Sequence, residues 1–333
     1  MNVLVLCCLR SLIPLALIAL FFCPSLVAQD MAPEKKAVLC FDFQLDRLME
    51  SELGQSLIES GKINQEDWTL SAPPNKFKRI FGLMGTPGSF AEVAAMGPGN
   101  RPIPFEFIYQ IEFTDVVAAD KLINDMGLDL DDSSELNGLT LYRMPASPQN
   151  LFAGKKNEAT VIIGTTGYLS SKSKLSLFSP TLQQAWGRQN DAPIRVSFEL
   201  ISRADFFQEL IELCGQSPFQ ELTPVIELLG KFESVNLSFD PETDEMISLR
   251  SFANFGQANE LREGLSNLAG IAKIYGNGFA AQVEPETPNI ANVITSAVGD
   301  LNVVGEEREV NIIIGKPESM SAAIKEINTV EVR

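Results

Sequence analysis

Apolar and polar residues alternate along three separate stretches of this chain, and that pattern constrains the fold more than any other feature. In the clearest stretch, Phe105–Phe113, every second residue is aromatic or aliphatic. The same alternation recurs in Ile194–Leu200 and Phe232–Phe239. Because successive side chains of a strand point to opposite faces of a sheet, the pattern predicts strands with one apolar and one polar face.

Segments with helical periodicity separate the predicted strands. Val116, Ala119, Ile123 and Met126 recur every three or four residues, as one side of a helix requires. Strands mixed with helices in this way predict an α+β fold with a mixed or mainly antiparallel sheet and helices packed mainly on one face. The acidic stretch 129–135 is expected to be a loop, and one long helix is expected to end at Tyr275.

The first 28 residues have the layout of a secretory signal peptide. Arg10 precedes the apolar run Leu12–Cys23, and the chain turns polar after Val27-Ala28. An uncleaved anchor is the alternative, but the run is short for a bilayer span of roughly 20 residues. We expect a secreted or periplasmic protein with no stable membrane insertion after cleavage. Cys40 and Cys214 then remain, either joined by a disulfide or buried separately.

A weak internal repeat follows the predicted signal peptide. The segments Gln110–Phe113, Phe198–Ile201 and Phe252–Phe255 each lead through a tight turn into a helix. The recurrence predicts two related α+β halves, residues 29–190 and 191–333.

The charge balance excludes general nucleic-acid binding. The chain has 26 basic and 43 acidic residues, a net charge of −17. Removing residues 1–28 takes away only Arg10, so the mature net charge is 25 − 43 = −18. Such a surface repels phosphate backbones and anionic lipid.

The chain contains no histidine, which excludes several chemistries outright. Ser-His-Asp and Cys-His catalysis and metal sites built on imidazole all require that residue. The two cysteines of the mature chain are too few for a four-cysteine zinc site. We therefore predict no catalytic residue, no metal and no cofactor.

Three short motifs have faint functional interpretations. Ser171–Lys174 matches the S-x-x-K of serine acyl-enzymes, but the partner motifs are absent, which favours a solvated helix start. Gly276–Ala281 matches G-x-G-x-x-A, but it follows a helix where a nucleotide site needs a strand. The loop 129–135 begins like a calcium loop and lacks its glycine, so an acidic turn or weak cation binding remains.

The polar face of the predicted sheet provides the candidate site. Its alternate residues are expected to lie in water, as on many antiparallel sheets, and could form a shallow platform for a protein or glycan partner. Two of them, Glu106 and Glu112, could in principle perform acid–base hydrolysis. The candidate binding residues are Glu106, Glu112, Arg195, Glu199 and Arg250.

One resemblance is carried by residues 136–143, LNGLTLYR, and by 159–165, ATVIIGT, with the helix after them. These segments resemble a group of uncharacterised exported bacterial proteins with repeated strand–helix–strand–strand units behind a signal peptide. The resemblance implies the layout and no functional residue. The sequence as a whole predicts an exported, non-catalytic protein of structural or interaction type. The alternatives are a binder of a small polar ligand or cation and, beyond that, an enzyme that relies on carboxylates, Ser, Lys or Tyr.

Overall fold

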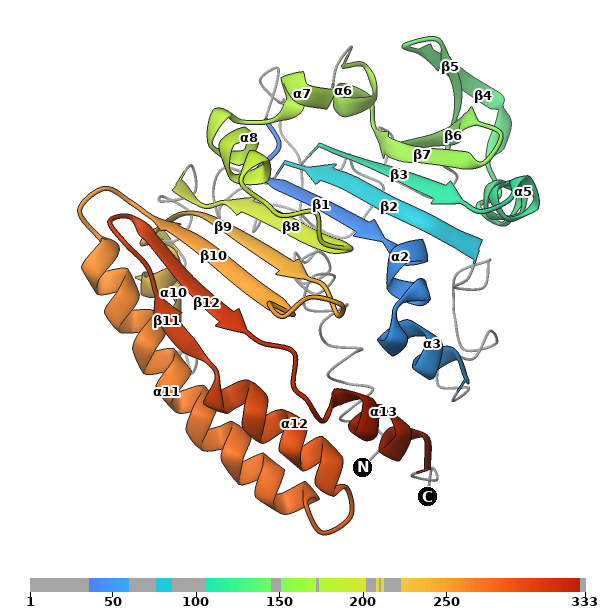
Figure 1. Cartoon of the computed structure of the whole chain (residues 1–333). Coiled ribbons are helices and arrows are strands. Elements are labelled where there is room, and N and C mark those ends of the chain that lie inside the picture. The colour runs from blue at the N-terminus through green and yellow to red at the C-terminus, as the bar shows by residue number, and fades with distance from the viewer. Residues whose placement is uncertain are drawn as a thin grey trace.

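A single antiparallel sheet organises the protein (Figure 1). The computed structural model describes residues 36–59, 76–85, 106–144, 151–171, 174–201, 208–209, 211–212 and 223–329. The predicted signal peptide, residues 1–28, and Cys214 lie outside the described residues. In these residues the sheet has twelve strands in the order β11-β12-β10-β9-β8-β1-β2-β3-β7-β6-β5-β4. The predicted α+β class with a mainly antiparallel sheet is confirmed.

All three alternating stretches form strands, and Phe232–Phe239 is β9. The stretch Phe105–Phe113 contains β3, and Ile194–Leu200 contains β8. The acidic stretch 129–135, predicted as a loop, is instead the edge strand β4. An edge strand leaves one side unpaired, and acidic side chains there oppose pairing with another chain. The strands are β1 (Leu39–Gln44), β2 (Phe77–Met84), β3 (Phe107–Phe113), β4 (Asp129–Leu136), β5 (Leu139–Arg143), β6 (Leu151–Asn157), β7 (Thr160–Thr165), β8 (Ile194–Glu199), β9 (Phe232–Phe239), β10 (Ile247–Ala253), β11 (Asn302–Val304) and β12 (Glu309–Ile314).

The register divides the side chains of the sheet between an apolar and a polar face. Phe41 of β1 is opposite Gly82 of β2 and Val196 of β8, and these residues belong to the apolar face. The neighbouring row, Phe81, Asp42 and Arg195, points to the other side. We call that other side the polar face; in the central strands it carries Asp42, Gln44, Arg79, Gln110, Glu112, Arg195, Ser197, Ser234, Asn236, Ser238, Ser248 and Arg250.

Helices cover parts of both faces, which differs from the expectation of helices mainly on one. Apolar side chains of α5 and α11 pack on the apolar face, beside Phe113 and Val310 respectively. The segment from α6 to α8 packs on the polar face, around Cys40 and Leu83. At that end of the sheet the polar face carries apolar side chains, such as Cys40 and Leu83, and the apolar sides of these helices pack against them. The helices are α2 (Leu45–Glu50), α3 (Glu52–Glu59), α5 (Val116–Asp125), α6 (Thr166–Leu169), α7 (Lys174–Leu177), α8 (Pro180–Gly187), α10 (Thr223–Leu229), α11 (Ala258–Val283), α12 (Pro288–Gly299) and α13 (Met320–Thr329).

Side-chain caps fix where two of these helices begin. Asp115 accepts a hydrogen bond of 2.8 Å from the amide of Ala118 at the start of α5, and its other oxygen lies 2.7 Å from Lys76 Nζ. The bond from Lys76, helped by that amide, lowers the pKa of the Asp115 carboxyl below its ordinary value. At α8, Ser179 accepts from the amide of Leu182 at 2.9 Å.

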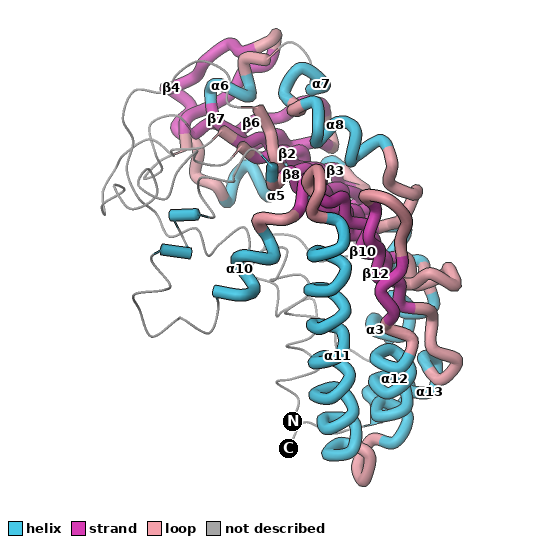
Figure 2. The backbone as a smooth tube through the Cα atoms, turned by 90° about the vertical axis from the view of Figure 1, so that its left-hand side faces the viewer, coloured by secondary structure: helices cyan, strands magenta, loops and turns pink. Residues whose placement is uncertain are grey.

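The helix α11 is longer than predicted. It was expected to end at Tyr275, but it continues through Gly276 and Gly278 to Val283. A Cβ atom on Gly276 would lie 2.4 Å from Val298 of α12, so close packing between the two helices requires a glycine at that point. This packing outweighs the low helix propensity of glycine. Figure 2 shows α11 and α12 running side by side past the end of the sheet.

Replacement of Gly82 by alanine is expected to destabilise the fold. An added Cβ would lie 2.2 Å from the Phe41 ring and 2.7 Å from the Tyr109 ring, which close over this glycine. Overpacking of this kind costs about 1–3 kcal/mol. Urea unfolding measures the change. The matched control, Gly270→Ala, adds a Cβ into open space on α11 and should stabilise the chain by up to about 1 kcal/mol. Equal effects of the two substitutions would contradict this packing.

Candidate functional site

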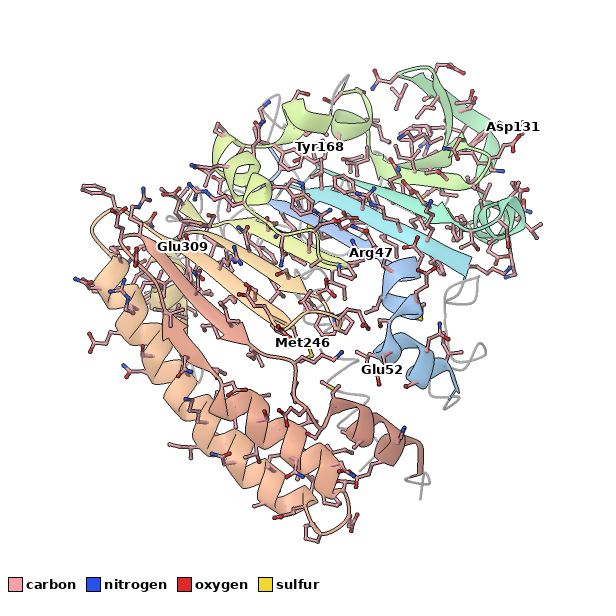
Figure 3. All side chains as sticks on the ribbon, in the orientation of Figure 1. Arg47, Glu52, Asp131, Tyr168, Met246 and Glu309 are labelled. Carbon is pink, nitrogen blue, oxygen red and sulfur yellow. The ribbon has the colours of Figure 1, made fainter. Side chains whose placement is uncertain are left out.

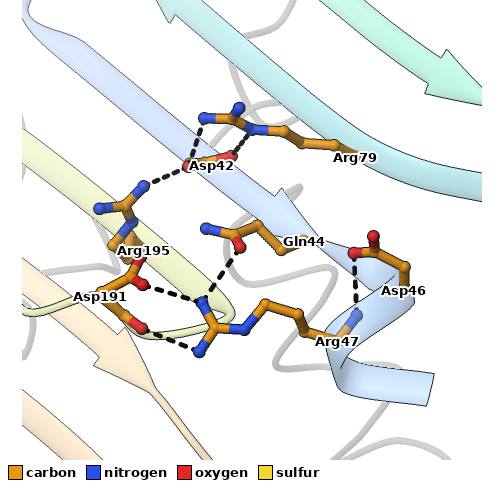
Figure 4. A network of polar contacts seen from close by, with 7 residues as sticks. All are labelled: Asp42, Gln44, Asp46, Arg47, Arg79, Asp191 and Arg195. Atoms are coloured by element: carbon orange, nitrogen blue, oxygen red, sulfur yellow. Dashed lines mark hydrogen bonds and ion pairs between the residues drawn. The ribbon is translucent and has the colours of Figure 1, made fainter. Parts of the chain in front are cut away.

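The polar face carries a network of charged groups centred on Asp42. This carboxylate is fully buried. It accepts two hydrogen bonds from Arg79, with Nε 2.6 Å from Oδ1 and Nη2 2.9 Å from Oδ2, and a third from Arg195 Nη2 (Figure 4). The three residues come from the neighbouring strands β1, β2 and β8. A buried carboxylate needs such partners, because moving its charge out of water without compensating hydrogen bonds costs free energy.

The two arginines differ in what surrounds them: the Arg195 side chain is 16% exposed and that of Arg79 is 38% exposed. The Arg195 guanidinium lies 4.9 Å from the centre of the Trp186 ring, where a cation–π contact is favourable. The hydrogen bond to Asp42 is the largest influence on Arg79 and raises the pKa of its guanidinium, with Glu112 and Asp191 adding in the same direction. The Arg79 guanidinium therefore stays protonated at any physiological pH.

The network continues along the sheet in both directions. Glu112 is the cross-strand partner of Arg79 and accepts a 2.6 Å hydrogen bond from Gln110. On the other side, Arg47 donates to Gln44 at 3.1 Å and lies 3.3 Å from an Asp191 carboxylate oxygen. Glu112 and Arg47 thus each have a polar or charged partner beside the Asp42 group.

Two of the predicted site residues serve as supports for the helices above them. Glu106 accepts hydrogen bonds from the Thr165 hydroxyl and, at 3.2 Å, from the amide of Tyr168 in the first turn of α6. Glu199 accepts from the hydroxyl of Ser179, the residue that caps α8. Both carboxylates are buried. They hold helix starts on the sheet and do not face solvent.

The other predicted residues lie apart from one another. Glu112 and Arg195 belong to the Asp42 network, whereas Arg250 of β10 donates to Ser248 at 3.3 Å and to Glu245 at 3.4 Å. Glu106 and Glu112 are six residues apart along one extended segment, which at ~3.3 Å per residue separates them by roughly 20 Å. A carboxylate pair that hydrolyses a glycoside lies about 5–10 Å apart. The five residues do not converge on one point.

Sequence reasoning missed Asp42 and Arg79, the two central members of the network. A signal was present, because Asp42 is the one charged residue in the apolar segment Ala37–Phe43. A single charge inside an apolar strand indicates a buried partner of opposite charge.

The expectation of a water-exposed polar face is wrong for its central strands. Ser197, Ser234, Asn236 and Ser248 are all buried. Asn236 donates to the carbonyl of Ala185 in α8 at 3.0 Å and accepts from Ser197 at 2.7 Å. Small polar side chains thus bond α8 to the sheet, and the helix excludes water from them.

A shallow open hollow of about 310 Å³ lies where α2 and α3 approach the β9–β10 hairpin. Figure 3 labels two of its residues, Arg47 and Glu52, together with Met246 of the hairpin. Two of the acidic side chains that line it have partners within the protein: Glu242 accepts from the Glu52 amide at 2.9 Å, and Lys316 lies 3.9 Å from the Glu52 carboxylate. The lining residues are Arg47, Glu50, Ser51, Glu52 and Glu242.

The described part of the chain holds no cluster of three or more Cys, Asp or Glu side chains placed to bind a metal ion. In the same residues, none of the helices combines the length and apolar character needed to cross a bilayer.

No family model matches the chain. No curated protein sequence matches it either. Among solved structures, it is similar to three crystal forms of TP0453. Form III has a TM-score of 0.40 and 10% identity over 88% of this chain and 98% of that one. Form I has 0.36 and 12% over 90% and 98%, and form IV has 0.37 and 10% over 89% and 97%. Likeness at this level transfers no function.

Replacing Asp42 by asparagine should strongly destabilise the protein. The substitution leaves the Arg79 and Arg195 charges without their carboxylate, and breaking a buried pair in this way costs about 3–5 kcal/mol. Chemical denaturation measures the loss. As the control, Asp125→Asn removes a partly exposed ion pair with Lys121 on α5 and should cost about 1 kcal/mol or less. Similar losses in the two variants would argue against a central role for Asp42.

Proposed function

We propose that this chain is an exported, non-catalytic protein whose role is structural or interaction-based. The observation that carries the proposal is how the polar face uses its charges. Glu106 and Glu199 hold helix starts, and Asp42 holds two arginines. A carboxylate-based glycoside hydrolase would instead need two carboxyl groups that flank the scissile bond. These groups stabilise the fold, so we assign the interaction role to the exposed surface.

We also propose that the body consists of two related halves, residues 29–190 and 191–333. The strand order supports this. From the centre of the sheet outward, one half runs β1-β2-β3-β7-β6-β5-β4 and the other β8-β9-β10-β12-β11, so the first half has two more strands at its outer edge. In each half, the last strand in the sequence pairs with the second strand of the hairpin: β7 pairs with β3 of the β2–β3 hairpin, and β12 pairs with β10 of the β9–β10 hairpin. Both also begin with a strand–helix–strand–strand unit, the layout of the exported bacterial proteins that the sequence resembles.

A binder of a small polar ligand or cation is the second candidate, and the hollow between α2, α3 and the β9–β10 hairpin favours it. The hollow is open and rich in carboxylates. Its support is weaker, since Glu242 and Glu52 already have partners within the protein.

Export is tested by fractionating bacteria that express the full chain or a chain without residues 2–28. We expect the full chain to reach the periplasm or medium with Gln29 as its first residue, and the shortened chain to stay in the cytoplasm. N-terminal sequencing and intact mass identify the cleavage site. Full-length protein retained in the membrane fraction would support an uncleaved anchor and contradict this proposal.

Ligand binding is tested by thermal unfolding with calcium chloride and with neutral sugars. A ligand at 100 times its Kd would stabilise the fold by about 2.7 kcal/mol, which raises the Tm of a large domain by several degrees. We expect no such rise. A rise that Glu242→Gln abolishes would favour the second candidate, and Glu245→Gln, on the same hairpin outside the hollow, is the matched control.

A further inference from the structure

The helix α11 has two apolar stripes, and only one of them is buried. The inner stripe packs against the sheet and α12 and includes Leu261, Leu265 and Val283. A surface helix normally has one apolar stripe, directed at the core. The outer stripe lies in the middle of the helix, where four large side chains are exposed: Leu268 by 37%, Ile271 by 50%, Ile274 by 73% and Tyr275 by 76%.

The outer stripe lies in a region nearly free of charge. Residues 264–283 contain one charged side chain, Lys273, and α12 contains none. The whole chain, by contrast, is 21% charged with a net charge of −17. Two copies of this protein therefore repel each other through most of their surfaces, but not through this stripe.

We infer that the outer stripe of α11 binds the same stripe of a second copy of this chain, with the two helices antiparallel. The inference rests on the proposed interaction role. Leu268, Ile271, Tyr275 and Gly278 follow the spacing i, i+3, i+7 and i+10, which is the seam of a two-helix coiled coil.

Antiparallel pairing makes this seam self-complementary. The symmetric register places Ile271 against the second copy's Tyr275, and Leu268 against the second copy's Gly278. Open space surrounds Gly278, so it can accommodate a leucine side chain. A two-fold interface requires this reciprocity, in which residue i contacts residue j and residue j contacts residue i.

The charges around the stripe favour a second copy over a lipid surface. Helices that lie on membranes carry many Lys and Arg residues beside the apolar face. Here the flanking charges are mainly acidic, with Glu260 and Glu263 before the stripe and Glu284 and Glu286 after it. Anionic headgroups would repel these residues.

The dimer should be weak and should strengthen with salt. Four side chains per copy cover less than the roughly 800 Å² per partner of a standard interface. Salt screens the repulsion between two processed chains of net charge 25 − 43 = −18, while the apolar contact remains. A complex of oppositely charged partners would instead weaken as the salt concentration rises.

Sedimentation equilibrium of the processed chain, over a range of protein and NaCl concentrations, tests the dimer. Ile271→Glu and Tyr275→Lys should each weaken it ~30-fold or more, the effect of losing a central contact. Asn277→Glu, the control for Ile271→Glu, adds the same negative charge at an exposed position outside the seam of α11 and should leave the dimer intact. Thermal unfolding should show that all three variants remain folded.

Mixing the two disruptive variants tests the antiparallel register. One Ile271→Glu chain and one Tyr275→Lys chain would bring the new carboxylate against the new ammonium and keep one native Ile271–Tyr275 contact. We expect the mixture to dimerise where neither variant does alone. No recovery on mixing overturns the antiparallel arrangement, since a parallel pair would place position 271 against itself.

A chain that stays monomeric at all concentrations and salt levels overturns the inference. If that monomer floats with phosphatidylcholine vesicles, and Ile271→Glu abolishes flotation, the stripe binds lipid instead. Neither result affects the export and ligand experiments, so the proposed function can stand when the dimer fails.

Discussion

The contact between Asp42 and its two arginines lies at the junction between the two sides of the sheet. In the strand order, β1 and β8 are the neighbours at which residues before 190 meet residues after it. Asp42 of β1 and Arg195 of β8 are direct cross-strand partners at that junction, and Arg79 adds β2. The strand hydrogen bonds alone would join the two sides. The buried charge adds specificity, because a register slip would turn Asp42 into the apolar face.

The strands of this fold could be predicted from sequence, but the environment of the polar face could not. Alternation shows which residues share a face, and Ser197 and Asn236 do share one. It does not show which face a helix will cover. Ser and Asn are compatible with water or with the backbone of a packed helix, and here the carbonyl of Ala185 decides between them. Glu106 and Glu199 were predicted to be surface acids because their partners, Tyr168 and Ser179, belong to helix starts whose packing the strand pattern does not show.

Local propensity failed at two places, for one physical reason. The acidic stretch 129–135 forms β4 because β5 pairs with it through the Asn137-Gly138 turn, in which both residues have positive φ. The glycines of α11 remain helical because α12 packs against Gly276. In both cases a neighbouring element supplies the stabilisation that the local sequence lacks. By contrast, the Val116–Met126 period predicted α5 well, since its own cap and apolar side already specify it.

The absence of histidine has a consequence for how such a scaffold behaves. Histidine is the side chain whose ordinary pKa lies within the physiological range, and this chain has none. No imidazole can therefore change charge beside the hydrogen bonds of Asp42 with its two arginines or that of Glu199 with Ser179. The body therefore keeps a nearly constant and strongly negative charge around neutral pH. A protein that repels its own copies in this way associates most readily through a neutral surface, and α11 has its apolar side chains on such a surface.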